Sequence, residues 1–499
     1  MDGIGIGIIG CGRIADMAYE GYAGIPGARI QAVCDADEGT ARRRAAEWGV
    51  KKWHTDYRRL LEDPDVHAVE ILTPHASHVG ICLDAIGAGK HLALQKPMTV
   101  DRAEAEKLVA ASANATTVCK VTENYVFYPP IRFASQIIRE GWIGTPSSIS
   151  IKLIAGGKGG WPVPPSAWAW RVKEFAQGRG MQTFDHGHHL WSTARFLLGP
   201  IEKVSAWIGT TASVIDSPAA IMWKHRDGDV FGLCEYVYGQ DMEIPSRYYA
   251  NDEWIQVSGS AGILRINRCT GELLGGPSVS LYAKDRWREF RIPSDWKLGF
   301  KGSAWNFIRA IRGEEKPRLS FQEGMEILSI DLAIARSSQA GREVRLKPDG
   351  AMVPAWAAHL AGKAELRRFK AAKRRLHRGE GRIGSDDAAV RAVQLTRELP
   401  SRAGDPDGPR EDMAVGLALS DSSFPGGTKR MSLIIRNGKI DVEEDVLPDK
   451  PSLTIRTEAK VWAGILSKAQ SIEAAYLQGR LKLEGSVERA LSLKKLFRL

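Results

Sequence analysis

Hydrophobic and polar positions over the first 124 residues follow two periods in turn. Short apolar runs, which are typical of buried strands, end at Asp35, Pro74, Pro97 and Asn124. Stretches of helical period lie between these runs. This alternation predicts an α/β fold with a doubly wound parallel sheet of the Rossmann type. In such a sheet the ligand crevice lies at the carboxyl ends of the strands.

The first strand runs into the glycine-rich loop "GCGRIA" at 10–15, which has the spacing G-x-G-x-x-A. Gly10 permits the tight turn, and Gly12 lets the backbone approach a pyrophosphate at the helix N-terminus. Asp35 stands twenty residues after Ala15, where a carboxylate can bind ribose hydroxyls. This constellation predicts a dinucleotide site. Asp35 favours NAD over NADP, because its charge repels a 2′-phosphate.

Residues 125–350 show a different pattern, which predicts a second, α+β domain. The stretches "KVSAWIG", "VFGLCEYVYG" and "WIQVSGS" alternate apolar and polar residues, as in an open antiparallel sheet. Before them, the segment 151–175 combines glycines and prolines with Trp161, Trp168 and Trp170. These rings either stack on a sugar or an aromatic aglycone over the active site, or pack structurally.

Four polar side chains gather within five positions, at Asp185, His186, His188 and His189. On a helix, Asp185 and His189 face the same side, which suits a catalytic set. Two other interpretations stay open. The four could bind zinc, although their spacing is not His-Glu-x-x-His. Asp185 could also simply be the N-cap of a helix.

The last part of the chain begins with the basic segment 351–384. This segment is interpreted either as a solvated helix or linker, or as a patch that binds a membrane surface or an acidic partner. Residues 385–499 then mix strands and helices, which predicts a third, α+β domain. Within it, "MSLIIRNGKIDVEED" is typical of a β-hairpin whose Asn437-Gly438 suits a type I′ turn.

Composition narrows the protein class further. With 43% hydrophobic and 26% charged residues over 499 positions, the chain has ample material for two or three globular domains. We expect neither a signal peptide nor a membrane span, and six scattered cysteines indicate a reducing, cytoplasmic location. The net charge of +10 owes much to the basic segment, and no nucleic-acid motif accompanies it, so we expect no nucleic-acid partner.

Several motifs resemble the Gfo/Idh/MocA oxidoreductases, the family of glucose–fructose oxidoreductase and inositol dehydrogenase. They are "GIIGCGRIA", "ILTPHASH", "LQKPMTVDRAEA", "ENYVFYPPI", "DEWIQVSGSAGIL" and the stretch from Ser303 to Val344. The resemblance covers residues 1–345 in order. It implies that Lys96, Asp185 and His189 meet at the substrate as the catalytic set.

The resemblance and the motifs together imply further site residues. Those for the cofactor are Gly10, Gly12, Arg13, Ile14, Asp35, Thr73, Pro74, His78, Gln95, Lys96 and Asn124. Those for the substrate are Tyr125, Trp161, Trp170, Arg171 and His188. The resemblance implies no metal. It does imply a homo-oligomer, a dimer or tetramer that is built on the open sheet.

Two positions depart from the family pattern. Gln95 replaces the glutamate that usually precedes the lysine, and the loss of a carboxylate there would lower the pKa of Lys96 or alter cofactor contacts. His75 replaces the asparagine that usually follows Pro74.

The segment 385–499 resembles the sterol carrier protein type 2 domain, above all in "SLTIRTEAKVWAGILS" and "AAYLQGRLKLEGSVERALSLKKLF". The resemblance implies a lipid or another apolar ligand, although such a domain can also serve only for packing.

The chain is therefore interpreted as an NAD-dependent dehydrogenase that oxidises a secondary hydroxyl of a sugar, polyol or glycoside, with Lys96 and His189 moving the proton. Two alternatives remain open. One is a redox-neutral glycosidase or lyase that recycles its NAD, and the other is a non-catalytic NAD-binding scaffold with a lipid-carrier tail.

Overall fold

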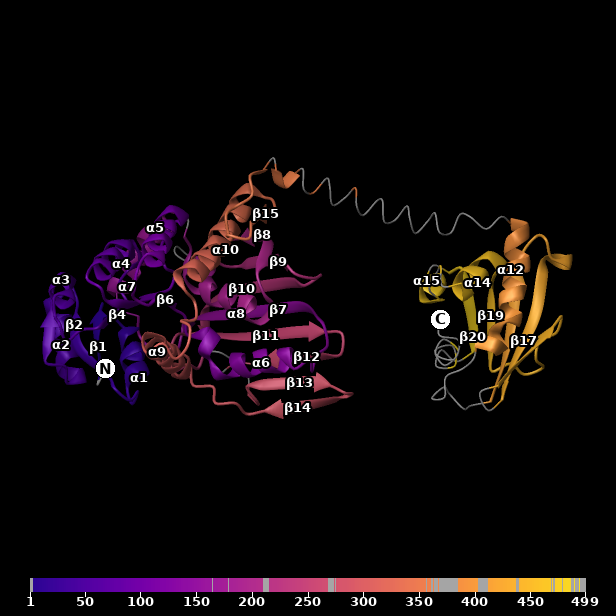
Figure 1. The fold of residues 1–499 in the computed structure, drawn as a ribbon, viewed down its shortest axis with the longest axis horizontal. Helices are drawn as coiled ribbons and strands as arrows, with labels where there is room; N and C mark the ends of the chain where they lie inside the picture. Colours follow the sequence, from indigo (N-terminus) through magenta and orange to yellow (C-terminus); the bar gives the residue numbers. More distant parts are fainter. Residues whose placement is uncertain are drawn as a thin grey trace. The chain divides into compact units, whose positions relative to one another are not determined.

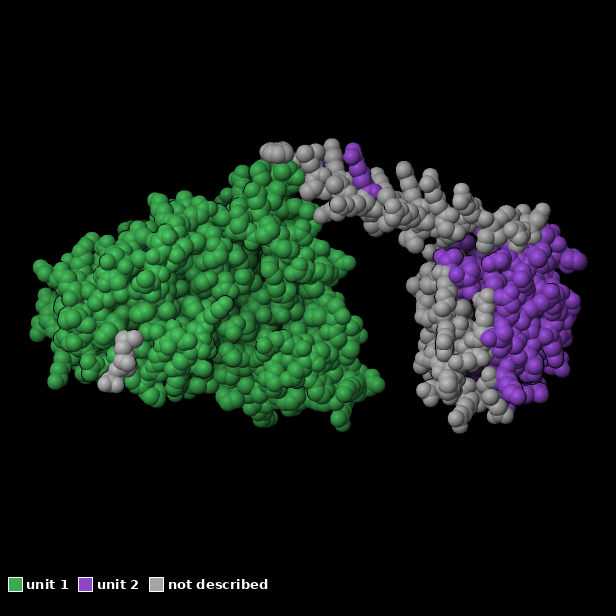
Figure 2. Space-filling model, viewed as in Figure 1, with its two compact units in different colours: residues 1–358 green, residues 359–499 purple. Residues whose placement is uncertain are grey.

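The computed structural model forms two compact units, Met1–Ala358 and His359–Leu499 (Figure 2). It describes residues 3–163, 165–177, 179–209, 215–267, 273, 275–355, 357–359, 362, 367, 385–402, 412–436, 439–467, 469, 472–477, 479–485, 489 and 493. The basic segment 351–384 and the Asn437-Gly438 turn thus lie largely or wholly outside the described residues. The finer domain boundaries expected at 124 and 350 stay predictions. Within the described ranges, no helix is both long and apolar enough to cross a membrane.

The first unit begins with the predicted doubly wound sheet, whose six parallel strands have the order β3-β2-β1-β4-β5-β6. The order reverses between β1 and β4, so the crevice of the fold opens at their carboxyl ends. The strands are β1 (Ile4–Ile9), β2 (Ala28–Cys34), β3 (Lys52–His54), β4 (Ala68–Ile71), β5 (His91–Gln95) and β6 (Cys119–Thr122). The helices around them are α1 (Ala15–Tyr22), α2 (Glu38–Trp48), α3 (Tyr57–Leu61), α4 (His78–Gly87) and α5 (Arg102–Ala113).

A nine-stranded sheet follows in the same unit, with the order β14-β13-β12-β11-β7-β10-β9-β8-β15 (Figure 1). The expected antiparallel sheet is corrected to a mixed one, because β7 and β10, at its centre, run parallel. The strands are β7 (Pro146–Lys158), β8 (Ile201–Ile208), β9 (Ala219–His225), β10 (Phe231–Glu243), β11 (Asn251–Gly259), β12 (Gly262–Ile266), β13 (Val279–Ala283), β14 (Arg286–Phe290) and β15 (Val344–Arg345).

Helices cover one face of this sheet and leave side chains of the other exposed. The helices of this part are α6 (Pro129–Arg139), α7 (Pro165–Phe175), α8 (Gly187–Leu198), α9 (Lys297–Ile311) and α10 (Phe321–Ala340). Of these, α10 packs on β8, α8 and α5, and α9 packs on α1, which joins the nine-stranded sheet to the Rossmann part. Large apolar side chains on the open face are Trp207, Met222, Phe231 and Leu233.

The second unit is built around a five-stranded sheet of order β18-β17-β16-β19-β20. Its own core includes Trp462, whose Nε1 donates to Oγ1 of Thr396 at 2.9 Å. The predicted hairpin is present as β17 and β18. The elements are α12 (Ser385–Arg397), α13 (Leu399–Arg402), β16 (Met413–Ser420), β17 (Thr428–Arg436), β18 (Lys439–Glu444), β19 (Leu453–Glu458), α14 (Ala459–Leu466), α15 (Ile472–Leu477) and β20 (Leu481–Gly485).

Candidate active site

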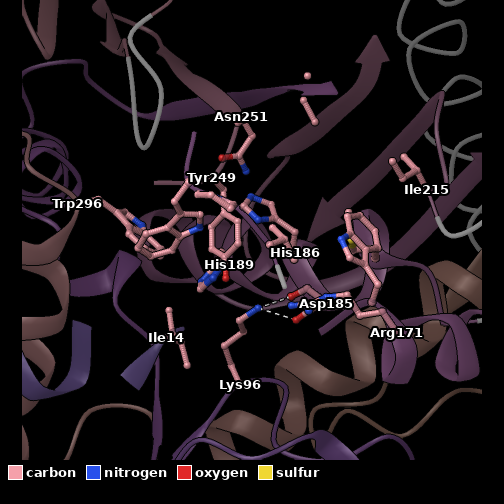
Figure 3. Close-up of a pocket in the computed structure, with 18 of the residues that line it drawn as sticks. Ile14, Lys96, Arg171, Asp185, His186, His189, Ile215, Tyr249, Asn251 and Trp296 are labelled. Carbon is pink, nitrogen blue, oxygen red and sulfur yellow. Dashed lines mark hydrogen bonds and ion pairs between the residues drawn. The ribbon is translucent and has the colours of Figure 1, made fainter. Parts of the chain in front are cut away.

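A cavity of about 470 Å³ opens at the carboxyl ends of the parallel strands, where the Rossmann part meets the nine-stranded sheet (Figure 3). The Rossmann part contributes Ile14, Leu72, Thr73, His75, Gln95, Lys96 and Asn124 to its lining. Aromatic and polar side chains of the second part line the opposite side, among them Trp161, Trp168, Trp170, Arg171, Asp185, His186, His189, Tyr249, Asn251 and Trp296. The cavity therefore brings together most of the predicted catalytic and substrate residues.

Lys96 and Asp185 form an ion pair at the centre of this cavity. Nζ of Lys96 donates to Oδ1 of Asp185 at 2.8 Å and to its backbone oxygen at 2.7 Å. Arg171 approaches the other carboxylate oxygen at 3.3 Å. Burial acts to raise the pKa of Asp185, but Lys96, Arg171 and His75 outweigh it and hold that pKa well below its usual range. Asp185 is therefore a carboxylate, and it fixes the ammonium group of Lys96.

His189 has a carboxylate partner of its own in Glu123, which follows strand β6. Its Nδ1 lies 2.7 and 2.9 Å from the two oxygens of Glu123. Tyr125 stacks on the imidazole with ring centroids 4.2 Å apart. Burial lowers the pKa of His189 despite the nearby Glu123, so the ring is neutral. A neutral ring that donates from Nδ1 to a carboxylate carries its lone pair on Nε2, so His189 can act as a base in the cavity.

The four clustered polar side chains diverge, each to a separate partner. His186 bonds to Glu253 at 2.5 Å and His188 to Asp331 at 3.3 Å. No group of three or more His, Cys, Asp or Glu side chains is placed to bind a metal in the part of the chain that the structure describes. Asp185 is not the N-cap of a helix, because it lies in a π-helical turn, Met181–His186, and the N-cap of α8 is His186.

The glycine loop fits a dinucleotide. Gly10 has φ +93°, and a Cβ there would lie 2.8 Å from the backbone of Leu72, whereas a Cβ on Gly12 would meet open space. Asp35 accepts from the amide of Cys11 in this loop at 2.8 Å. Nδ2 of Asn124 is buried in the cavity wall and has no hydrogen-bond partner among the described residues. A buried N–H group of this kind is suited to donate a hydrogen bond to a bound ligand.

Comparison with known proteins agrees with this architecture. The Gfo/Idh/MocA oxidoreductase model, described as an NAD-binding Rossmann fold, matches residues 4–123, and its C-terminal-domain model matches 131–265. The NAD-dependent scyllo-inositol 2-dehydrogenase of Bacillus subtilis is 31% identical, over 68% of this chain and 95% of its own length. The D-apiose dehydrogenase of Paraburkholderia graminis is 26% identical, over 70% of this chain and 91% of its own.

The chain belongs to the Gfo/Idh/MocA oxidoreductase family. It is an enzyme of the dehydrogenase type, as the sequence motifs predicted. Its fold also matches the solved levoglucosan dehydrogenase in complex with NADH and L-sorbose, with a TM-score of 0.59 and 22% identity over 70% of this chain and all of that one. Residues 417–498 match the SCP-2 sterol transfer family, which confirms the fusion of the two domain types.

Among the predicted ligand residues outside the cavity lining, His188, Tyr125 and His78 are buried beneath the site. His188 is fully buried against Asp331, and burial lowers its pKa to about 3. Tyr125 is also buried and supports His189 from behind, while its hydroxyl bonds to Glu253 at 2.9 Å. His78 bonds instead to the backbone oxygens of Thr73 and Met98. Each packs under the site because its helix or loop turns that side chain toward the core.

The two departures from the family pattern have structural consequences. Gln95 accepts from the amide of Lys96 at 2.8 Å, so it shapes the backbone under the lysine. His75 is buried and bonds through Nδ1 to Glu174 of helix α7. Its Nε2 lies 3.8 Å from Oδ1 of Asp185. The contact of Glu174 with His75 could not be predicted from sequence, because it depends on where helix α7 packs in the folded protein.

Glu123 has a sequence signal, since it stands at a predicted strand end beside Asn124. The structure pairs it with a histidine 66 positions away. Sequence spacing does not reveal such a contact. His186 likewise lines the cavity, in place of the predicted His188.

Proposed function

We propose that this chain is an NAD-dependent dehydrogenase that oxidises a secondary hydroxyl of a sugar, polyol or glycoside. The observation that carries the proposal is His189, held by Glu123, in one cavity with the Lys96–Asp185 pair and the strand ends of the Rossmann part. A base and a fixed cation beside a nucleotide site are what alcohol oxidation requires.

His189 is the proton acceptor in this scheme. Its Nε2 takes the hydroxyl proton of the substrate, and the resulting imidazolium is stabilised by the Glu123 carboxylate. Burial acts to raise the pKa of Glu123, but His189 and a 2.8 Å hydrogen bond from the amide of Tyr125 hold it at about 2. NAD, when bound, supplies the two-electron oxidant.

Lys96 stabilises the developing alkoxide. Two of its three N–H groups are engaged by Asp185, which leaves one for the substrate oxygen. Because Asp185 and Arg171 fix this geometry before the substrate arrives, the ammonium needs little reorganisation during the reaction.

The relatives support the substrate class. Their names describe dehydrogenases of apiose, scyllo-inositol, myo-inositol and levoglucosan, which are all polyhydroxylated compounds. The cavity of this chain offers the mixture that such compounds need, with Asn251 and His186 for hydroxyls and flat rings for sugar faces.

We assign the cofactor as NAD on the basis of charge. Asp35 and Asp37 stand together after β2, where a 2′-phosphate would have to lie. Arg44, the nearby half-buried cation, is engaged by Asp16 at 2.6 Å. The site thus has two acids and an already paired arginine at the position that distinguishes the two cofactors.

Two further assignments belong to this proposal. The open face of the nine-stranded sheet, with Trp207 and Phe231 exposed, would be covered in a homo-oligomer. The SCP-2 match supports an apolar ligand for residues 417–498.

The test is NADH formation at 340 nm by the full chain with NAD⁺ and a panel of inositols, pentoses, hexoses and their glycosides. We expect turnover that falls by at least about a hundredfold in Lys96→Met and in His189→Asn. If wild-type protein yields no NADH with the panel but converts a glycoside without net redox change, the recycling alternative replaces this proposal.

A further inference from the structure

The cavity extends past the catalytic centre, on the side away from the cofactor. Figure 3 shows Ile14 and Trp296 on one side of the Lys96–Asp185 pair, and Ile215 with Arg171 on the other. Ile14 belongs to the glycine loop, so it marks the cofactor side. A substrate whose hydroxyl meets Lys96 has room to extend its remaining part toward Ile215.

This far end, which we define as Trp170, Met181 and Ile215, is apolar. Arg171, the cation beside it, has its charge engaged elsewhere. Its guanidinium donates to Asp185 and to the backbone oxygen of Ala167, and it stacks on Trp170 at 4.3 Å. The far end therefore presents rings, a thioether and a branched aliphatic side chain to whatever enters it.

The far end is also held in place before any ligand binds. Ile215 is 7% exposed, and the next residue, Asp216, accepts from the amide of Thr183 at 2.9 Å. This bond ties Ile215 to the π-helical turn that carries Met181. A Cβ on Gly180 would overlap the Asp216 carboxylate, so the approach of the two segments depends on that glycine. A preformed surface loses little conformational entropy on binding.

We propose that the far end is a subsite for an apolar group carried by the hydroxylated ring, so that the substrates are alkyl or aryl glycosides and not free sugars or polyols. This inference rests on the proposed dehydrogenase function. A free polyol would leave the rings at the far end facing water, whereas an aryl or alkyl aglycone removes that apolar surface from water. Methionine and tryptophan side chains suit such groups, because they are polarisable and large.

The experiment compares substrates that differ only in the aglycone. Methyl, octyl and phenyl β-D-glucopyranoside, with the matching galactopyranosides, are given to the full chain with NAD⁺, beside the free sugars and inositols. We expect kcat/KM for the phenyl and octyl compounds to exceed that of the methyl compound by roughly ten- to a hundred-fold, the effect of burying one such group.

Variants then locate the preference. Met181→Gln keeps the length of the side chain and makes it polar, and Ile215→Thr keeps its branched shape. Each is expected to reduce the phenyl-to-methyl ratio at least threefold. Leu83→Gln, on the exposed surface of α4, is the matched apolar-to-polar control and keeps the wild-type ratio.

The outcomes separate the two proposals. Equal kcat/KM for methyl and phenyl compounds, or turnover of polyols alone, overturns the apolar subsite and leaves the dehydrogenase intact. A preference that survives in both variants also overturns it, since the aglycone then binds elsewhere. Absence of NADH with every compound contradicts the dehydrogenase function and the subsite with it.

Discussion

Nδ1 of His75 lies 2.9 Å from Oε2 of Glu174, and this contact joins the end of strand β4 to helix α7. The same helix carries Trp170 and Arg171, and the edge of His75 meets the ring of Trp170 at 5.0 Å. The pair thus holds the helix that forms one wall of the cavity against the Rossmann part.

Breaking this contact should weaken substrate binding more than chemistry. Glu174→Gln and His75→Asn are each expected to raise KM about tenfold, the effect of losing one charged hydrogen bond of about 1.5 kcal/mol. Steady-state kinetics with the best substrate of the panel measure it. Glu106→Gln, at an exposed ion pair with Arg102, is the control. A lower kcat at unchanged KM would mean that the pair acts on catalysis directly.

Glu123 should matter as much as His189 itself. In Glu123→Gln the imidazole loses the carboxylate that fixes its tautomer and stabilises its cation, so kcat should fall by about 10²–10⁴. Because the two residues act as a unit, the double variant with His189→Asn should be no slower than the slower single variant. Additive losses in that cycle would show that they act independently.

Lys96→Met should separate catalysis from cofactor binding. We expect kcat to fall by about 10²–10³, since one preorganised donor to the alkoxide is lost. The Kd of NADH, followed by its fluorescence, should change by less than about threefold, because the glycine loop and Asp35 are intact. If the chain were a scaffold without catalytic function, neither the wild-type protein nor the Lys96→Met variant would show turnover.

Cofactor choice should follow the charge at the end of β2. Asp35→Ser is expected to raise the ratio of kcat/KM for NADP over NAD by roughly ten- to a hundred-fold, since one repulsive charge is removed near the 2′-phosphate. Glu38→Gln, an exposed residue of α2, serves as the control. If the ratio stays constant, ribose recognition lies outside Asp35.

Acid should destabilise the first unit through its buried histidines. Burial lowers the pKa of His78 to about 4 and that of His188 to about 3. In the unfolded chain these histidines have an ordinary pKa near about 6.5. Between about pH 6.5 and pH 4 the unfolded chain therefore binds more protons than the folded one, so the free energy of unfolding falls as the pH drops through this range. Thermal unfolding across this range measures the slope. His78→Gln should flatten it, while His54→Gln, at the edge strand β3, should not.

The Rossmann part could be predicted from sequence, because the evidence for it is local. An apolar strand, a loop that needs Gly10 at φ +93° and an acid at the next strand end lie within 35 residues. The order of strands and helices then follows from the short right-handed connections of such sheets. Lys96, Asp185 and His189 were also predicted from sequence as the catalytic set, through the resemblance of their motifs to the family.

The partner of each of these side chains, in contrast, depends on the tertiary structure. Asp185 and His189 were expected on one helical face, but a π-helical turn aims Asp185 at Lys96, and His189 turns to Glu123. His188, beside it, faces the core and Asp331. These contacts join segments 66 to 143 positions apart. Local periodicity cannot show them, because they depend on how helix α8 packs against α10, α6 and β7, and a buried polar group must find a partner wherever the fold places one.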